Sequence, residues 1–149
     1  MAAIKPEIID QICKNSVPLF DFLNVSFEFL ADGVFQCHMP KERKVSNHLG
    51  SVYAGVQWSL AEVLGGIVFL SSGINGYVPI LKSMSIDFTK PALTDLVSEV
   101  RFTSNDVNEM KKSLDKDGRY NFELESNVKD INGNIVATGH AVYAIRKVR

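Results

Sequence analysis

The sequence predicts an α+β domain in which an antiparallel sheet wraps around one long, almost wholly apolar helix. Two observations carry this prediction. Several segments alternate polar and apolar residues as strands do, and one stretch, residues 52–70, is apolar with few interruptions. A helix that is apolar on all sides must be buried on all sides, and a curled sheet is the simplest cover for it.

Length and composition indicate one ordinary globular domain, residues 1–149. Hydrophobic residues make up 46% of the chain and charged residues 22%, and the net charge is -1. This charge balance argues against a nucleic-acid binder with a broad basic face. The N-terminus lacks the apolar core of a signal peptide, and Gln57, Ser59 and Glu62 interrupt the apolar stretch. We therefore expect a cytoplasmic protein without a membrane span.

The two cysteines, Cys13 and Cys37, indicate reduced and buried thiols. They form no C-x-x-C pair, and no histidine stands at a zinc-ligand spacing from them. We expect no metal site and no redox cofactor.

The first part of the chain predicts a helix followed by a hairpin. Residues 5–15 form a short amphipathic helix with Pro6 in its first turn. Residues 17–23 have no clean period and predict a loop whose phenylalanines pack against the domain. Residues 24–30 alternate, and residues 34–39 form the partner strand after an Ala-Asp-Gly turn.

The apolar helix follows a polar loop, and Ser51 is placed to cap it. Gly65 and Gly66 are poor helix formers, so packing must hold the turn in which they lie. Small residues there also allow other parts of the chain to approach the helix closely.

Four strands are predicted after the helix. They span residues 78–89, 95–104, 120–129 and 134–148. Residues 105–115 form a short amphipathic helix between the second and third, and Asn132-Gly133 makes a two-residue hairpin turn between the last two. The total is a sheet of about six strands.

The chemistry-bearing residues gather around the start of the apolar helix. Polar residues at 47–51 precede a helix N-terminus, where free N–H groups can bind an oxyanion. Glu62 lies about three turns further in, where an unpaired charge is costly. A carboxylate kept in such a helix is a candidate functional group. The alternative, a Glu62 that faces water or a structural partner, stays open on this pattern alone.

The spacing of these residues resembles the hot-dog fold acyl-CoA thioesterases. The pattern N-x-x-G-x-x-x-x-G covers Asn47, Gly50 and Gly55, and an acid follows the asparagine by 15 residues (62 − 47). The segments "NHLG" and "LAE" are most similar to an uncharacterised, DUF4442-like branch. Lys-Pro-Ala at 90–92, Gly118 and the D-x-x-G-x-x-V-A hairpin at 130–137 extend the resemblance over residues 20–147.

The resemblance implies a homodimer, or a dimer of dimers, with each active site shared between two subunits. Glu62 would be the general base or nucleophile, and Asn47 of the other subunit would orient the water or the thioester. The backbone N–H of Ala54 or Gly55 would polarise the thioester carbonyl. Many of these enzymes have His-Gly-Gly where this chain has Tyr53-Ala54-Gly55. Tyr53 would then replace the histidine as a hydrogen-bond donor.

Two other interpretations stay open. Hot-dog 3-hydroxyacyl thioester dehydratases pair a histidine and a glutamate at a spacing similar to that of His48 and Glu62 (62 − 48 = 14). Those enzymes usually carry a proline where this chain has Ala54, so we expect His48 to be a loop residue beside the site. A non-catalytic acyl-CoA-binding module is the other possibility. Lys82 could line the acyl site or extend to the surface. Coenzyme A would enter only as part of the substrate.

Overall fold

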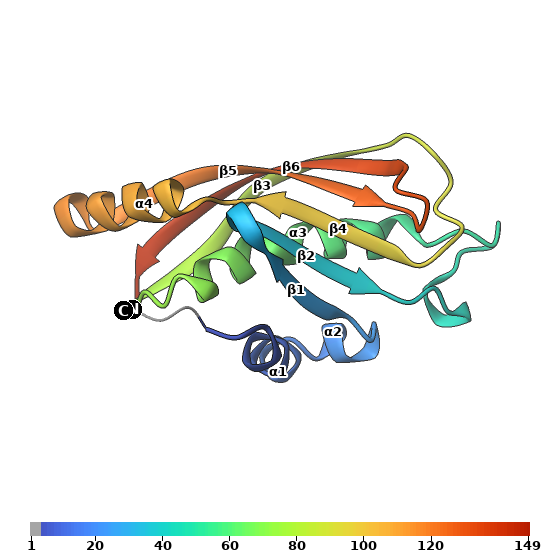
Figure 1. The fold of residues 1–149 in the computed structure, drawn as a ribbon, viewed down its shortest axis with the longest axis horizontal. Helices are drawn as coiled ribbons and strands as arrows, with labels where there is room; N and C mark the ends of the chain where they lie inside the picture. The colour runs from blue at the N-terminus through green and yellow to red at the C-terminus, as the bar shows by residue number, and fades with distance from the viewer. Residues whose placement is uncertain (1–3) are drawn as a thin grey trace.

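The computed structural model describes residues 4–149 and shows one curled antiparallel sheet around a central helix (Figure 1). The six strands lie in the order β1-β2-β4-β5-β6-β3. The central helix is α3, Ala54–Ser71, which the concave side of the sheet covers. The predicted α+β class and the curled six-stranded sheet are confirmed. Residues 1–3 of the predicted domain lie outside the described residues.

The elements follow the predicted order. The other helices are α1 Pro6–Ser16, α2 Pro18–Phe22 and α4 Ser104–Asp117. The strands are β1 Ser26–Leu30, β2 Val34–Met39, β3 Tyr77–Phe88, β4 Leu96–Arg101, β5 Arg119–Lys129 and β6 Ile135–Lys147. Short 3-10 turns occupy Ala31–Gly33 and Arg43–Val45. In space, α1 lies beside β1, and α4 extends from one end of the sheet (Figure 1).

The prediction of a loop at residues 17–23 is wrong, because Pro18 begins the short helix α2 there. Proline suits the first position of a helix, where its missing N–H would have no partner anyway. Phe20 is buried as expected, but Phe22 is 55% exposed. The ammonium of Lys44 lies 4.7 Å from the centroid of the Phe22 ring. A helix of five residues is too short for an apolar period to reveal it.

The apolar helix begins two residues later than predicted, and Ser51 does not cap it. Val52 N–H donates to the carbonyl of Ala92 at 2.8 Å, and Tyr53 N–H donates to the carbonyl of Val45 at 2.8 Å. These bonds hold the chain extended up to Tyr53, which is the N-cap residue and makes no side-chain cap. The hydroxyl of Ser51 instead donates to the side chain of Asn47.

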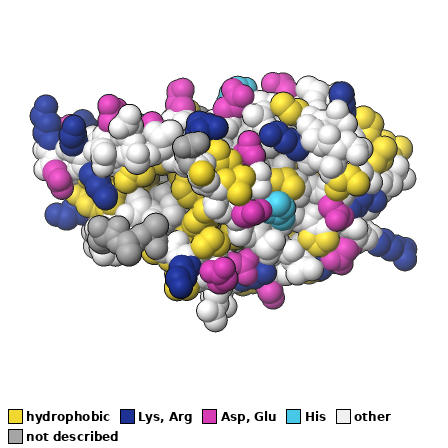
Figure 2. Space-filling view, in the orientation of Figure 1, with side chains coloured by type: hydrophobic (Ala, Val, Ile, Leu, Met, Phe, Trp, Pro, Cys, Tyr) yellow, Lys and Arg dark blue, Asp and Glu magenta, His cyan; other side chains and the backbone are white. Residues whose placement is uncertain are grey.

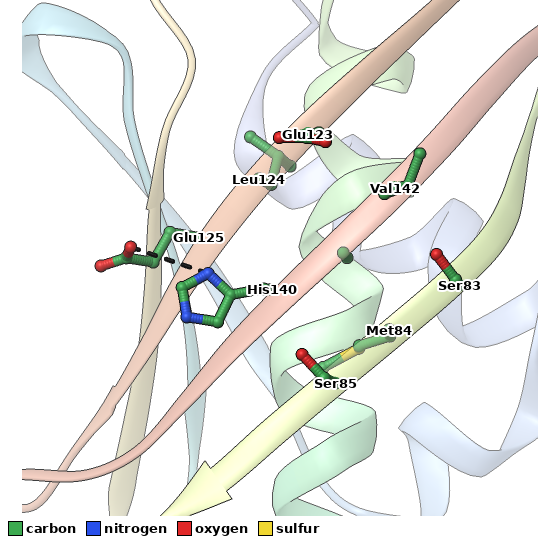
Figure 3. Close-up of a pocket in the computed structure, with 9 residues that line it drawn as sticks. Ser83, Met84, Ser85, Glu123, Leu124, Glu125, His140 and Val142 are labelled. Carbon is green, nitrogen blue, oxygen red and sulfur yellow. Dashed lines mark ion pairs between the residues drawn. The ribbon is translucent and has the colours of Figure 1, made fainter.

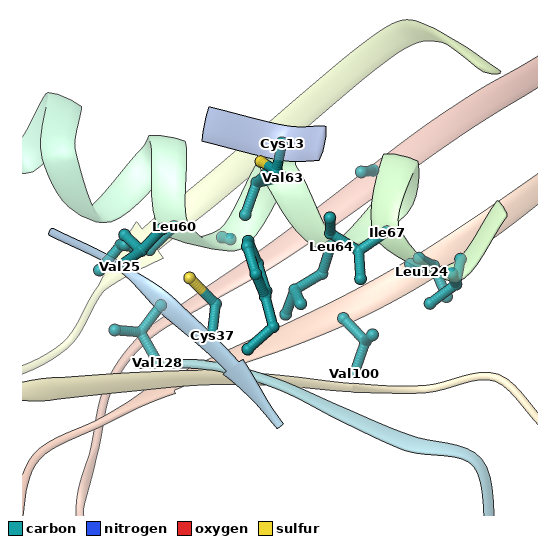
Figure 4. Packing of buried hydrophobic residues seen from close by; sticks show 14 of the residues in the cluster. Cys13, Val25, Cys37, Leu60, Val63, Leu64, Ile67, Val100, Leu124 and Val128 are labelled. Carbon is teal, nitrogen blue, oxygen red and sulfur yellow. The ribbon is translucent and has the colours of Figure 1, made fainter. Parts of the chain in front are cut away.

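The core lies between α3 and the concave face of the sheet (Figure 4). Its fully or almost fully buried side chains include Leu60, Leu64, Ile67, Val100, Leu124 and Val128. By length and composition α3 could also cross a membrane, but half of it is buried inside the protein. Cys13 and Cys37 are free and buried, as the sequence predicted.

One face of α3 is not covered, which contradicts the prediction that the helix is buried on all sides. Gly55, Ser59, Glu62 and Gly66 follow one another at spacings of four, three and four residues, so they share one face of the helix. Gly55 is exposed, and the other three are only partly buried. A Cβ added to Gly66 would meet no atom within 4 Å. The predicted catalytic carboxylate therefore lies on the open face of an otherwise buried helix.

Candidate active site

The loop before α3 is organised by the side chain of Asn47. Its Oδ1 accepts hydrogen bonds from the backbone N–H of Leu49 at 2.9 Å and from that of Ser51 at 3.2 Å. The Ser51 hydroxyl donates to the same oxygen at 3.2 Å. Because three donors converge on Oδ1, the amide nitrogen of Asn47 faces the other way. It has no acceptor within residues 4–149, so Asn47 can offer N–H donors to a ligand.

Gly50 closes this loop through its backbone. Its φ of 78° lies in the left-handed region that glycine adopts without strain. Its N–H donates to the carbonyl of Asn47 at 3.1 Å. His48 is exposed and, in the described chain, has no ion-pair or hydrogen-bond partner. The loop thus presents Asn47 while His48 points to solvent.

The start of α3 leaves two N–H donors without a partner. The carbonyl of Tyr53 accepts from Val56 N–H at 3.0 Å and from Gln57 N–H at 3.1 Å. The N–H groups of Ala54 and Gly55 have no acceptor among the residues described. These donors sit at the positive end of the helix dipole, which favours negative charge. They have the properties that an oxyanion hole requires.

Tyr53 lies over the first turn of the helix. A Cβ added to Gly55 would come within 2.7 Å of Cε1 of the Tyr53 ring, so the ring occupies the space of a side chain at this position. Tyr53 is nevertheless 58% exposed. The aromatic ring therefore borders the two free N–H donors, where a ligand at the helix start would meet it.

A cavity of about 350 Å³ joins the loop, the helix start and the end of β3. Its lining residues are Asn47, Ser51, Val52, Ala54, Gln57, Phe88, Thr89, Lys90, Pro91 and Ala92. The predicted site residues Asn47 and Ala54 are thus brought together. The Lys-Pro-Ala segment, which the sequence singled out only by resemblance, forms one wall.

Gln57 is a residue of this cavity that the sequence interpretation missed. It is buried, and its Nε2 donates to the carbonyl of Val52 at 3.0 Å. Its Oε1 is also buried and has no partner in the described part of the chain. The available signal was an amide side chain in the first turn of an otherwise apolar helix.

Glu62 lies away from this cavity in the same chain. It is eight residues beyond Ala54, which corresponds to about 12 Å along the helix axis, and it does not line the cavity. No cation or hydrogen-bond donor in residues 4–149 contacts its carboxylate. Burial raises the pKa of the Glu62 carboxyl above its ordinary value. Within one chain, the free N–H groups of Ala54 and Gly55 and the carboxylate of Glu62 therefore lie in separate places.

Helix α1 packs against α3 near Glu62. Burial, followed by the nearby charge of Asp10, raises the pKa of the Cys13 thiol to about 11, and the charge of Glu62 adds to this effect. Cys13 stays a protonated thiol at neutral pH, so it is not a reactive nucleophile. We assign it to the packing of α1 against α3.

Lys82, predicted to contact substrate, lies elsewhere. It is exposed at the point where the register of β3 against β6 shifts, between Leu81 and Ser83. It lines a cavity of about 500 Å³ with Arg119 and Arg146, not the cavity of Asn47.

Another depression, of about 510 Å³, lies over β3, β5 and β6 (Figure 3). There His140 Nδ1 lies 3.8 Å from Glu125 Oε2, and Ser83 and Ser85 line the same surface. Both partners of the ion pair are more than half exposed. Pairs exposed to this degree contribute little to stability, and no free helix terminus adjoins them. No three His, Cys, Asp or Glu side chains that could hold a metal ion cluster within residues 4–149.

The molecular surface seen in the orientation of Figure 1 carries acidic and basic side chains interspersed with apolar ones (Figure 2). No broad basic area covers this face.

The fold is the hot-dog fold of thioesterases, and comparison with known proteins gives the family. The chain belongs to the DUF4442 family, described as a domain of unknown function, which matches residues 6–145. No curated protein matches the chain.

Solved structures share the fold. A protein of unknown function from Pseudomonas aeruginosa, described as a probable thioesterase, is 28% identical, with 99% of each chain covered and a TM-score of 0.87. A thioesterase from Haemophilus influenzae is 13% identical, with 99% of this chain and 96% of the other covered and a TM-score of 0.79. A thioesterase from Staphylococcus aureus is 15% identical, with 87% of this chain and 99% of the other covered and a TM-score of 0.70.

The Staphylococcus aureus protein has been solved as two alanine mutants. One mutant replaces a glutamine and the other a glutamate. In that protein's own numbering, the two substituted positions are 15 residues apart.

Proposed function

We propose that this protein hydrolyses acyl thioesters, with acyl-CoA as the substrate. The observation that carries the proposal is the Glu62 carboxylate, which is partly buried, has no partner among the described residues and lies on the helix whose first N–H groups are free. Thioester hydrolysis requires an activated water and a stabilised oxyanion. Glu62 can supply the first, and the N–H groups of Ala54 and Gly55 the second.

In this mechanism Glu62 acts as a general base. Its carboxylate takes a proton from a water molecule while the water oxygen attacks the carbonyl carbon of the thioester. The N–H donors of Ala54 and Gly55 stabilise the oxyanion that forms. The C–S bond then breaks, the thiolate of coenzyme A leaves and takes the proton from Glu62, and the acyl group leaves as a carboxylic acid. Coenzyme A is part of the substrate, and no resident cofactor takes part.

The open edge of the sheet supports a dimer. The outer strand β1 has five residues and lies beside α1, whereas the other outer strand, β3, has 12 residues and a free edge. Val78, Ile80 and Phe88 of β3 are exposed. A long apolar edge strand of this kind is prone to pair with another strand. We infer that two chains pair along β3 to form a continuous sheet.

Such a dimer would complete the site. The cavity of Asn47 and Ala54 is also lined by Phe88, at the end of β3, so a partner paired along β3 would lie against it. The Glu62 carboxylate of the partner is then the candidate base, since Glu62 of the same chain does not reach the cavity. The 15 residues between Asn47 and Glu62 equal the separation of the two positions mutated in the Staphylococcus aureus thioesterase.

The dehydratase alternative receives no support from the loop geometry. A dehydratase base must reach its substrate, whereas the His48 ring is exposed and Asn47 is the residue that lines the cavity. Tyr53 stands where many related thioesterases carry a histidine, and its ring borders Gly55. We propose its hydroxyl as a hydrogen-bond donor to the bound thioester.

Thiol release from a panel of acyl-CoAs tests the proposal, run beside hydration of an enoyl-CoA. We expect thiol release from at least one acyl-CoA and no hydration. Hydration without hydrolysis would contradict the proposal and favour the dehydratase. Tight binding of acyl-CoA without turnover would also contradict it and would indicate a binding module.

A further inference from the structure

Three buried hydroxyl groups of the sheet donate to three consecutive carbonyls of α3. Ser98 Oγ of β4 donates to the carbonyl of Leu60 at 2.6 Å. Ser126 Oγ of β5 donates to that of Ala61 at 3.0 Å, and Tyr143 of β6 donates to that of Glu62 at 2.6 Å. β4, β5 and β6 lie side by side in the sheet, so neighbouring strands bind successive carbonyls of the helix. We propose that Tyr143, supported by Ser98 and Ser126, is a positioning residue that holds the backbone of Glu62 for the reaction.

Tyr143 is fixed on both sides. A Cβ added to Gly65 would lie 1.9 Å from Cζ of Tyr143, so the ring occupies the place of a side chain at residue 65. On the other side the ring is stacked on Phe122, with centroids 5.2 Å apart. Tyr143 is only 2% exposed. A hydroxyl on so constrained a ring can reach only the turn of the helix that begins at Glu62.

The position of the Glu62 carboxylate depends on this backbone anchor. No group in the described chain binds the carboxylate itself, so its side chain is placed by the backbone from which it starts. The neighbouring carbonyls of Leu60 and Ala61 are anchored in the same way by fully or almost fully buried serines. A displacement of about 1 Å at a reacting group can lower the rate about a hundredfold. The three hydroxyls therefore serve the reaction without touching the substrate.

Tyr77 provides a matched control. Its hydroxyl also donates to a helix carbonyl, that of Leu114 in α4, at 3.3 Å. Tyr143→Phe and Tyr77→Phe each remove one hydroxyl that binds a helix, but only the first acts on the helix that carries Glu62. Because phenylalanine keeps the ring, the stacking on Phe122 is retained in Tyr143→Phe.

The inference rests on the proposed function, so the experiment has an arm that needs no substrate. With the best acyl-CoA, we expect Tyr143→Phe to lower kcat by about tenfold or more with KM changed by less than about twofold. We expect Tyr77→Phe to change neither. Ser126→Ala gives a smaller loss of the same kind and keeps the test decisive if Tyr143→Phe does not fold.

In the substrate-free arm, hydrogen exchange is measured at the amides of Gly65 and Gly66. We expect faster exchange in Tyr143→Phe than in the wild type, and wild-type exchange at both glycines in Tyr77→Phe. Equal kcat and equal exchange in Tyr143→Phe and the wild type would overturn the inference. If the wild type hydrolyses no thioester, the proposed function fails, and the exchange result alone decides whether Tyr143 anchors the Glu62 turn.

Discussion

The two adjacent glycines of α3 give a sharp test of how Tyr143 packs against the helix. Gly65→Ala places a Cβ 1.9 Å from the Tyr143 ring, whereas the Cβ of Gly66→Ala meets nothing within 4 Å. In both variants alanine favours the helix by about 1 kcal/mol. In Gly65→Ala the ring must move, and the lost hydrogen bond of its hydroxyl costs about 1 kcal/mol. These two contributions cancel, which leaves the overpacking cost of about 1–3 kcal/mol.

Thermal and urea unfolding measure the difference directly. We expect Gly66→Ala to unfold a few degrees above the wild type and Gly65→Ala several degrees below it, at about 2–4 °C per kcal/mol for a domain of this size. Equal stability of the two variants would refute the close approach of Tyr143 to Gly65. A Gly66→Ala that is also destabilised would instead indicate that a second chain covers the open face of α3.

Three further predictions concern the site. Asn47→Asp keeps the side-chain oxygen that accepts from Leu49 and Ser51 but loses the side-chain N–H donors. We therefore expect unchanged thermal stability and a loss of about a hundredfold in kcat/KM. A wild-type rate would show that Asn47 only shapes the loop. The rate should fall as the pH drops through the raised pKa of Glu62, because the base must be ionised, and a midpoint at or below the ordinary glutamate value would refute this. Mixing inactive Asn47→Ala and Glu62→Gln chains should restore part of the activity, and no recovery in confirmed hybrid dimers would exclude a site shared in this way.

The raised pKa of Glu62 also links the site to stability. The native carboxyl binds its proton more tightly than the unfolded one, so this group lowers stability as the pH rises through that pKa. Glu62→Gln should therefore be at least as stable as the wild type at neutral pH, and this advantage should vanish below the ordinary glutamate pKa.

The sequence revealed the strands because burial alternates along them, and it revealed the central helix because residues 52–70 are apolar with few interruptions. Segments such as β5, with Phe122, Leu124 and Val128 inward, carry a period of two that any half-buried strand must show. The helix α2 and the true start of α3 were not predicted. The first depends on Pro18, and the second depends on backbone hydrogen bonds from Val52 and Tyr53 to distant segments. Local periodicity carries no information on such bonds.

The site was predictable only in part, for a similar reason. The sequence placed Asn47, the helix start and Glu62 in the right order, since all three lie within one short stretch. It could not show that the oxygen of Asn47 is committed to its own loop. Nor could it link Tyr143 to Glu62, because 81 residues separate them and only the folded sheet brings them together. The glycine at position 65 was the one local sign that something packs closely there.

Glu62→Gln tests the central claim most directly. Glutamine keeps the size of the side chain but cannot accept the proton of the attacking water, and Glu123→Gln, an exposed position on β5, is the matched control. With thiol release from the best acyl-CoA as the assay, we predict that Glu62→Gln loses at least about a hundredfold in kcat, the scale of a lost general base, with no loss of thermal stability. Glu123→Gln should keep the wild-type rate. A Glu62→Gln protein that hydrolyses acyl-CoA as fast as the wild type would contradict the account.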